Sequence, residues 1–207
     1  MHTHTAAALA ISLFSGSCAS LSMQKTGFLD DYDRLESVPE QTVAFIPDEI
    51  WLYRDANSHS IDSLWIAPIE IRLAEDSEVE LDDEDARDLK RAFENYLKRN
   101  LGEGYEIVDS PRESTGIVRT AITDVDPSSV LANIVGIILV VPFDMGGISA
   151  ELEITSASTG SSIVAMKACR GGTPFLVIEC FQRWGHAYHG MHKWTLQLRE
   201  LLDEGQS

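Results

Sequence analysis

The stretch Ile148–Arg170, ISAELEITSASTGSSIVAMKACR, decides the fold. Its first part, Ile148–Thr155, alternates apolar and polar residues, which predicts a strand with one buried face. The tetrapeptide Ser158-Thr159-Gly160-Ser161 is typical of a hairpin turn, and Ser162–Arg170 then predicts the returning strand. The sequence therefore predicts an antiparallel hairpin near the C-terminal end of the chain.

Shorter strands are predicted upstream of this hairpin. In chain order they are Thr42–Ile46, Ile50–Tyr53, Leu64–Leu73, Tyr105–Val108 and Gly116–Val125. Pro68 lies inside the third of them and predicts an edge or a bulge, because proline cannot donate to a strand ladder. Val130–Phe143 is the most apolar stretch, and we expect it to be buried in the core. A loop that touches a membrane or a partner is the alternative for it.

Two helices complete the pattern. The first, Leu81–Asn100, has Asp82 as its N-cap and an apolar stripe made by Ala86, Leu89, Phe93, Tyr96 and Leu97. The second, His186–Leu202, has an apolar stripe made by Ala187, Met191, Trp194, Leu198 and Leu201. Strands joined as hairpins, with helices between and after them, predict one α+β domain. We expect an antiparallel or mixed sheet with the two main helices packed on one face.

The N-terminus predicts export. Ala6–Phe14 is a short apolar run followed by the small residues Ser15, Gly16 and Ser17, which is the layout of a signal peptide over residues 1–17. Nine residues rise only about 14 Å as a helix, less than the ~30 Å of a bilayer core, so this run does not predict a membrane span. A small-residue zone that ends in Cys18 is similar to a lipoprotein signal. We therefore expect Cys18 to be acylated, with ordinary signal-peptidase cleavage as the alternative.

Residues 18–40 are expected to form a lipidated tether and docking segment, and residues 41–207 the α+β domain. Ala19–Gly27 is mostly small and polar. The next eight residues, FLDDYDRL, contain four large apolar side chains, namely Phe28, Leu29, Tyr32 and Leu35. Such side chains are unfavourable on a free linker, so we expect this segment to dock on the domain as a helical turn or as a wrapped segment.

Charge limits the choice of partners. The formal net charge is −17, and the 17-residue leader contains no Asp, Glu, Lys or Arg. Removing the leader from the 207 residues leaves 190 residues, which carry all of that charge and suffice for one domain. A strongly acidic domain repels phosphate backbones, so nucleic-acid binding is not expected. The charge favours basic partners.

The number of cysteines is consistent with an oxidising compartment. Acylation of Cys18 leaves the pair Cys169 and Cys180. A disulfide between them would close a loop of about eleven residues and add about 2–3 kcal/mol of stability. Two buried thiols are the alternative.

Few residues suggest a catalytic or metal-binding role. The sequence has no nucleophile elbow, phosphate-binding loop, dinucleotide fingerprint or zinc-protease motif, so we expect no catalytic residue and no cofactor. His186 and His189 are weak metal candidates, because side chains three apart share a helical face, but His192 points elsewhere on a regular helix. A polar helix face is the simpler interpretation. Glu151 and Glu153 share one strand face, where we expect them to be exposed to solvent.

Three stretches carry a family resemblance. They are Thr26–Leu35 (TGFLDDYDRL), Val118–Ser128 (VRTAITDVDPS), and the hairpin Ser149–Arg170 followed by a helix that opens at Trp184 and contains Trp194. In this order they resemble a family of proteobacterial lipoproteins known as domain of unknown function 3313. The resemblance implies an envelope lipoprotein with one α+β domain, and it implies no activity, cofactor or catalytic residue.

The expected function is therefore non-enzymatic. We expect a bacterial envelope lipoprotein, anchored by lipid and most simply placed at the outer membrane facing the periplasm, that binds another envelope protein. A periplasmic small-ligand or lipid-binding module is the first alternative, with Val130–Phe143 lining the cavity. A metal-dependent hydrolase that uses the histidines is the less favoured one.

Overall fold

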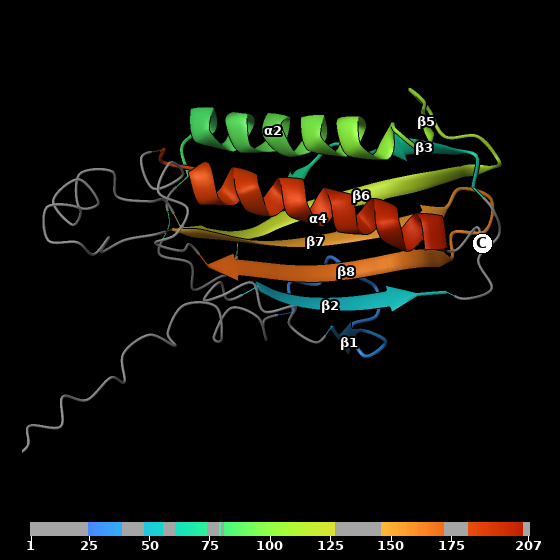
Figure 1. The fold of residues 1–207 in the computed structure, drawn as a ribbon, viewed down its shortest axis with the longest axis horizontal. Coiled ribbons are helices and arrows are strands. Elements are labelled where there is room, and N and C mark those ends of the chain that lie inside the picture. The colour runs from blue at the N-terminus through green and yellow to red at the C-terminus, as the bar shows by residue number, and fades with distance from the viewer. Residues whose placement is uncertain are drawn as a thin grey trace, which may run out of the picture.

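The computed structural model describes residues 25–38, 48–55, 61–73, 79, 81–126, 146–171 and 182–204. In this part of the chain one mixed sheet packs against two helices (Figure 1). The elements are β1 (Glu36–Ser37), β2 (Asp48–Arg54), β3 (Ser63–Ile66), β4 (Glu70–Ile71), α2 (Asp83–Leu101), β5 (Glu106–Ile107), β6 (Thr115–Asp126), β7 (Gly147–Ser156), β8 (Ser162–Gly171) and α4 (Gly185–Asp203). The strand order is β1-β2-β8-β7-β6-β3-β5, and β4 also pairs with β6.

The predicted hairpin is confirmed as β7 and β8, at the centre of the sheet. The two strands pair antiparallel, with Glu151 opposite Lys167. Gly160 at the hairpin tip has a φ of 70°, a left-handed value that glycine adopts without a steric penalty. The predicted strand Leu64–Leu73 is divided around Pro68 into β3 and β4, which both run parallel to β6. These parallel pairs make the sheet mixed.

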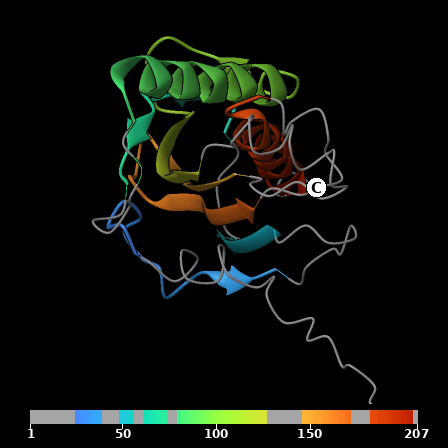
Figure 2. The same cartoon turned by 90° about the vertical axis from the view of Figure 1, so that its left-hand side faces the viewer.

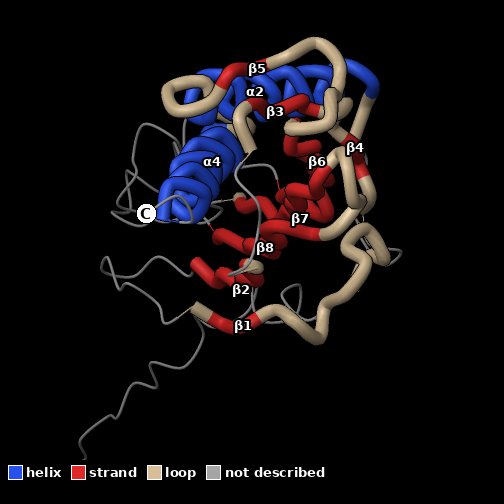
Figure 3. The backbone as a smooth tube through the Cα atoms, turned by 90° about the vertical axis from the view of Figure 1, so that its right-hand side faces the viewer, coloured by secondary structure: helices blue, strands red, loops and turns tan. Residues whose placement is uncertain are grey.

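The two helices cover one face of the sheet, as predicted (Figures 2 and 3). Helix α2 begins after Asp82, whose Oδ1 accepts hydrogen bonds from the amides of Glu84 and Asp85 at 3.0 and 2.8 Å. The starts of the two helices are joined by a 2.8 Å hydrogen bond from Trp184 Nε1 to Asp85 Oδ1. At the far end of α4 the buried residue is Leu202, whereas the predicted Leu201 is only half-buried.

The core lies between the helices and the sheet. Fully buried helix residues include Leu89, Phe93, Leu97, Met191, Trp194 and Leu198. They meet the apolar side chains of β6, β7 and β8, namely Val118, Ile122, Ile148, Ala150, Leu152, Ile154, Val164, Met166 and Ala168. Alternation then places the residues between these on the opposite face of the same strands.

The opposite face of the sheet is covered by residues Thr26–Leu35, which we call the strap. Phe28 and Leu29 are almost completely buried, at 1% and 3% exposed, and pack on Ala121 and Ala165. Those two alanines leave room for the larger side chains. The strap wraps across the strands as bends and turns and does not form a helical turn.

Several predictions fall on parts of the chain that the structure does not describe. Cys18, Cys180, the strand Thr42–Ile46 and the apolar stretch Val130–Phe143 lie outside the described residues. Neither α2 nor α4, the helices of the described part, is long and apolar enough to cross a bilayer.

Candidate functional site

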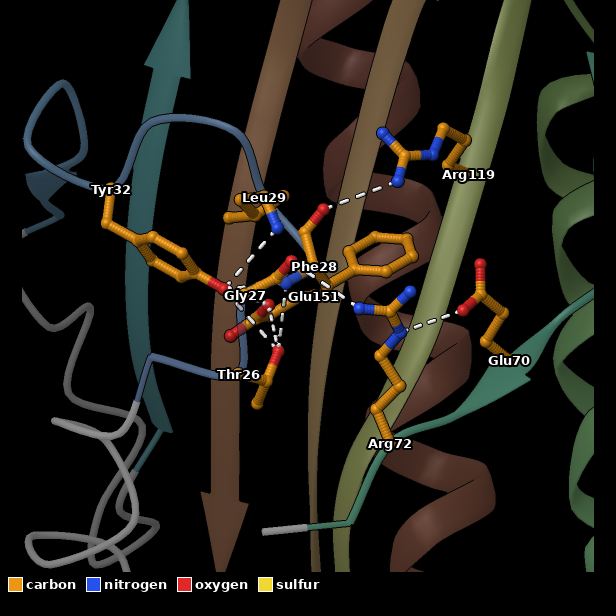
Figure 4. Close-up of polar contacts among 9 residues, drawn as sticks. All are labelled: Thr26, Gly27, Phe28, Leu29, Tyr32, Glu70, Arg72, Arg119 and Glu151. Carbon is orange, nitrogen blue, oxygen red and sulfur yellow. Dashed lines mark hydrogen bonds and ion pairs between the residues drawn. The ribbon is translucent and has the colours of Figure 1, made fainter.

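The strap is held by a buried carboxylate at the middle of the sheet. Glu151 projects from β7 on the face away from the helices and is 0% exposed. Its Oε2 accepts hydrogen bonds from Thr26 Oγ1 and Tyr32 Oη, both at 2.7 Å (Figure 4). Hydroxyl donors at such short distances make strong hydrogen bonds to a carboxyl oxygen. Glu151 therefore fixes two points of the strap to one strand.

The Tyr32 hydroxyl also closes the strap on itself. Its oxygen accepts from the amides of Phe28 and Leu29 at 3.1 and 3.3 Å while its proton goes to Glu151. Burial, reinforced by the hydrogen bond to Glu151, raises the pKa of Tyr32 above its usual range. Gly27 supports the tight bend with a φ of 73°. The strap is thus an ordered turn built around one phenol group.

Two arginines hold the same bend from the other side. The Phe28 ring lies between Arg119 and Arg72, whose guanidinium carbons are 4.8 and 5.4 Å from the ring centroid. Arg119 donates to the Phe28 carbonyl and Arg72 to the Gly27 carbonyl, both at 3.4 Å (Figure 4). Arg72 is itself positioned by Glu70, at 2.8 Å. Cation–π contacts of this kind contribute about 0.5–2 kcal/mol each.

Charged residues under and beside the strap alternate in sign across the strands. Arg119 of β6 lies opposite Glu153 of β7 and pairs with it at 2.9 Å, and Glu151 lies opposite Lys167 of β8. Burial raises the pKa of Glu153 and lowers the pKa of Lys167, while Glu151 opposes the shift at Lys167. The expectation that Glu151 and Glu153 are exposed is wrong, because they are 0% and 2% exposed.

This arrangement is an intramolecular contact that holds the chain's own segment Thr26–Leu35 on the sheet. The two carboxylates are covered, so a substrate has no access to them while the strap is docked. The Arg119–Glu153 ion pair is costly to leave incomplete, because Glu153 is 2% exposed. The site therefore positions the strap, and with it the point where residues 18–24 join the domain.

The predicted metal candidates do not form a site in the described residues. His186 is buried, His189 is half-buried, and no cluster of three His, Cys, Asp or Glu residues occurs in this part of the chain. The third histidine, His192, stacks on Tyr96 with ring centroids 5.3 Å apart and points Nδ1 at donors of Arg99 and Asn100 at 3.1 Å.

The disulfide prediction stays a prediction. Cys169 is buried on β8, on the strap side of the sheet, and Cys180 lies outside the described residues.

Glu151 and Glu153 were recognised in the sequence, but their role was missed. One signal could have found it. Glu151 and Glu153 occupy alternate positions of β7, and Lys167 lies opposite Glu151 on the return strand β8. Opposite charges at facing positions indicate charge pairing on a covered face. A second signal is the apolar content of the strap, since a docked segment needs a face to cover.

Comparison with known proteins places the chain beside others of undefined role. The family model described as "Protein of unknown function (DUF3313)" matches residues 24–198, a range that includes the strap and the eight strands of the described part of the chain. No curated protein matches the chain significantly.

Two of the similar solved structures have low sequence identity. A PelC dodecamer from Paraburkholderia phytofirmans is 9% identical, with a TM-score of 0.46, 75% of this chain covered and 96% of that chain. Protein XCC0632 from Xanthomonas campestris, assigned to DUF330, is 11% identical, with a TM-score of 0.42, 70% of this chain covered and 86% of that chain. Both TM-scores are below 0.5, so neither likeness informs the function.

Proposed function

Since the chain belongs to the DUF3313 family, which is described only as proteins of unknown function, we propose a function from its own residues. It is a bacterial envelope lipoprotein, acylated at Cys18, whose domain binds another envelope component and performs no catalysis. The observation that carries the proposal is the strap. Residues 26–35 follow Cys18 closely in sequence and are built into the sheet through Glu151, Arg119 and Arg72.

A docked strap suits a protein whose N-terminus is anchored in a membrane. Acyl chains on Cys18 would hold the N-terminus at a bilayer, and more than one chain is needed for stable anchoring. The strap would then transmit that attachment to the centre of the sheet rather than to a loose end. The domain stays close to the membrane, where a high local concentration lets a partner bind with modest affinity.

Charge and the covered carboxylates support binding over catalysis. The net charge of −17 favours a partner with a basic surface. The two carboxylates that sequence alone would offer as acid–base groups are covered by the strap and used to hold it. Their role is then structural, and the outer surfaces of the domain remain for contact with a partner.

The anchor is tested by comparing the wild-type chain with Cys18→Ala, and with Cys169→Ala as the matched control that removes a different cysteine. We expect wild type and control to fractionate with membranes and to yield an acylated N-terminal Cys18 by mass spectrometry. Cys18→Ala is expected in the soluble periplasmic fraction. An unacylated mature N-terminus in the wild type would refute the proposal.

The partner is sought by crosslinking in intact envelopes. We expect wild type to be crosslinked to a specific protein with a basic surface, and Cys18→Ala to lose most of that product because its local concentration falls. Equal yields from both chains would contradict a role for the anchor in binding.

A further inference from the structure

We infer that the strap sets the orientation of the domain, with the strap-covered face of the sheet toward the bilayer and the α2–α4 layer away from it. The inference rests on the proposed acylation of Cys18. Beyond the proposed function, the inference specifies which surface of the domain faces the lipid and which surface is available to partners.

The point of attachment lies near the middle of the sheet. Thr26 is fixed on Glu151 of β7, the fourth of the seven strands in the order β1-β2-β8-β7-β6-β3-β5. In Figure 4 the strap lies in front of the strands, with α4 behind them. The strap is therefore pinned on the face opposite the helices, with Thr26 over the middle strands.

The tether is short. Seven peptide steps separate Cys18 from Lys25, the exposed residue just before the strap. At about 3.5 Å a step the tether reaches ~25 Å at most, whatever its conformation. A flexible chain of this length spans ~15 Å on average.

The helix face lies beyond that reach. At the level of Glu151 the sheet ends two strands from β7 on one side, at β4, and three strands from it on the other, at β1, which is ~10–14 Å at a spacing of ~4.8 Å. Passing the sheet and a helix of ~10 Å diameter adds about 20 Å. The shorter route, about 30 Å, still exceeds the ~25 Å tether, so the helices cannot lie on the bilayer while the strap is docked.

Attraction to lipid headgroups does not explain the same orientation. In residues 25–37 the exposed acids outnumber the exposed bases, with Asp30, Asp31, Asp33 and Glu36 against Lys25 and Arg34. An anionic headgroup repels such a surface. The orientation therefore depends on where the strap is pinned and on the length of the tether.

The test uses the lipidated full chain in vesicles of phosphatidylcholine and phosphatidylethanolamine that contain an acceptor dye on a headgroup. A donor dye is attached through an azide-bearing residue at position 30 on the strap or at position 91 on α2, both exposed. A matched variant carries twelve Gly and Ser residues inserted after Ser20, which lengthens the tether and leaves the strap sequence unchanged. In a second arm unacylated chains that begin at Cys18, with the same dyes and insertion and with Cys169→Ala and Cys180→Ala, are coupled through the Cys18 thiol to a maleimide lipid.

We expect energy transfer from position 30 to exceed transfer from position 91 by about twofold or more, because the domain separates the two sites by its thickness. The insertion is expected to bring the ratio close to one, since the longer tether reaches round the domain. A ratio near or below one without the insertion overturns the inference. A large ratio that the insertion leaves unchanged overturns it too, because direct lipid contact would then set the orientation.

The two arms separate the inference from the proposed function. If the first arm yields no vesicle-bound protein, acylation of Cys18 fails while the maleimide arm still measures the orientation. If the chain is bound in both arms but the ratio is near one, acylation stands and the orienting role of the strap fails.

Discussion

Replacing Tyr32 with phenylalanine removes one oxygen from the centre of the strap. The ring can keep its packing, whereas the hydroxyl loses its bond to Glu151 and no longer accepts from the amides of Phe28 and Leu29. The amide of Phe28 retains Thr26 Oγ1 as an acceptor at 3.3 Å. Glu151 Oε2 keeps only the hydrogen bond from Thr26 among those described.

The cost follows from these contacts. Removing one partner of a buried hydrogen bond costs about 1–3 kcal/mol, and the amide contacts contribute less because they are longer. We expect Tyr32→Phe to lower the free energy of unfolding by about 2–3 kcal/mol. The loss cannot exceed the free energy of docking the strap, because an undocked strap makes no contact with the sheet that the substitution could remove.

Urea unfolding of the acyl-free Cys18→Ala chain measures this cost, with Tyr96→Phe as the matched control. The ring face of Tyr96 stacks on His192, a contact that does not need the hydroxyl. The control should change the unfolding free energy by less than about 0.5 kcal/mol. A similarly small effect of Tyr32→Phe would refute the assignment of Glu151 as the site that holds the strap.

Three further predictions concern the domain itself. Asp82→Ala removes the cap of α2 and should cost about 1 kcal/mol in a thermal melt; an unchanged midpoint would contradict the capping role. Gly190→Ala places a methyl group 2.9 Å from Ile148 Cγ2 and should cost about 1–3 kcal/mol in urea, whereas a neutral result would mean that the core gives way. Burial, helped by Asp203, raises the pKa of Tyr105 to about 12, whereas an unfolded tyrosine loses its proton near pH ~10. Between these two pH values Tyr105 is protonated in the folded state and deprotonated in the unfolded state. The free energy of unfolding should therefore fall as pH rises from about 10 to 12. Urea unfolding across this range should show a shallower fall for Tyr105→Phe, and an identical fall would exclude Tyr105 as a cause.

Local periodicity explains which elements could be predicted. The hairpin β7–β8 and the helices α2 and α4 repeat their patterns over ten residues or more, and Gly160 marks the hairpin tip while Asp82 marks the start of α2. Parallel pairing of β3 with β6 was not predicted, because it joins segments about fifty residues apart and leaves no local pattern. β1 has two residues, too few for any alternation to be recognised.

The candidate site shows the same limit more sharply. Alternation in β7 predicts that Glu151 and Glu153 share a face, but it does not predict what lies over that face. The strap that covers them comes from 125 residues earlier in the chain. Apolar residues in the strap predict that it docks, and only the fold determines where.

The most direct test of the account is hydrogen exchange at the strap of the acyl-free Cys18→Ala chain. We predict slow exchange for the amides of Phe28 and Leu29, which donate to the hydroxyls that Glu151 holds, and loss of that protection in Glu151→Ala while β7 and β8 stay protected. Exchange of these two amides at the rate of an unstructured peptide in the parent chain would contradict a docked strap.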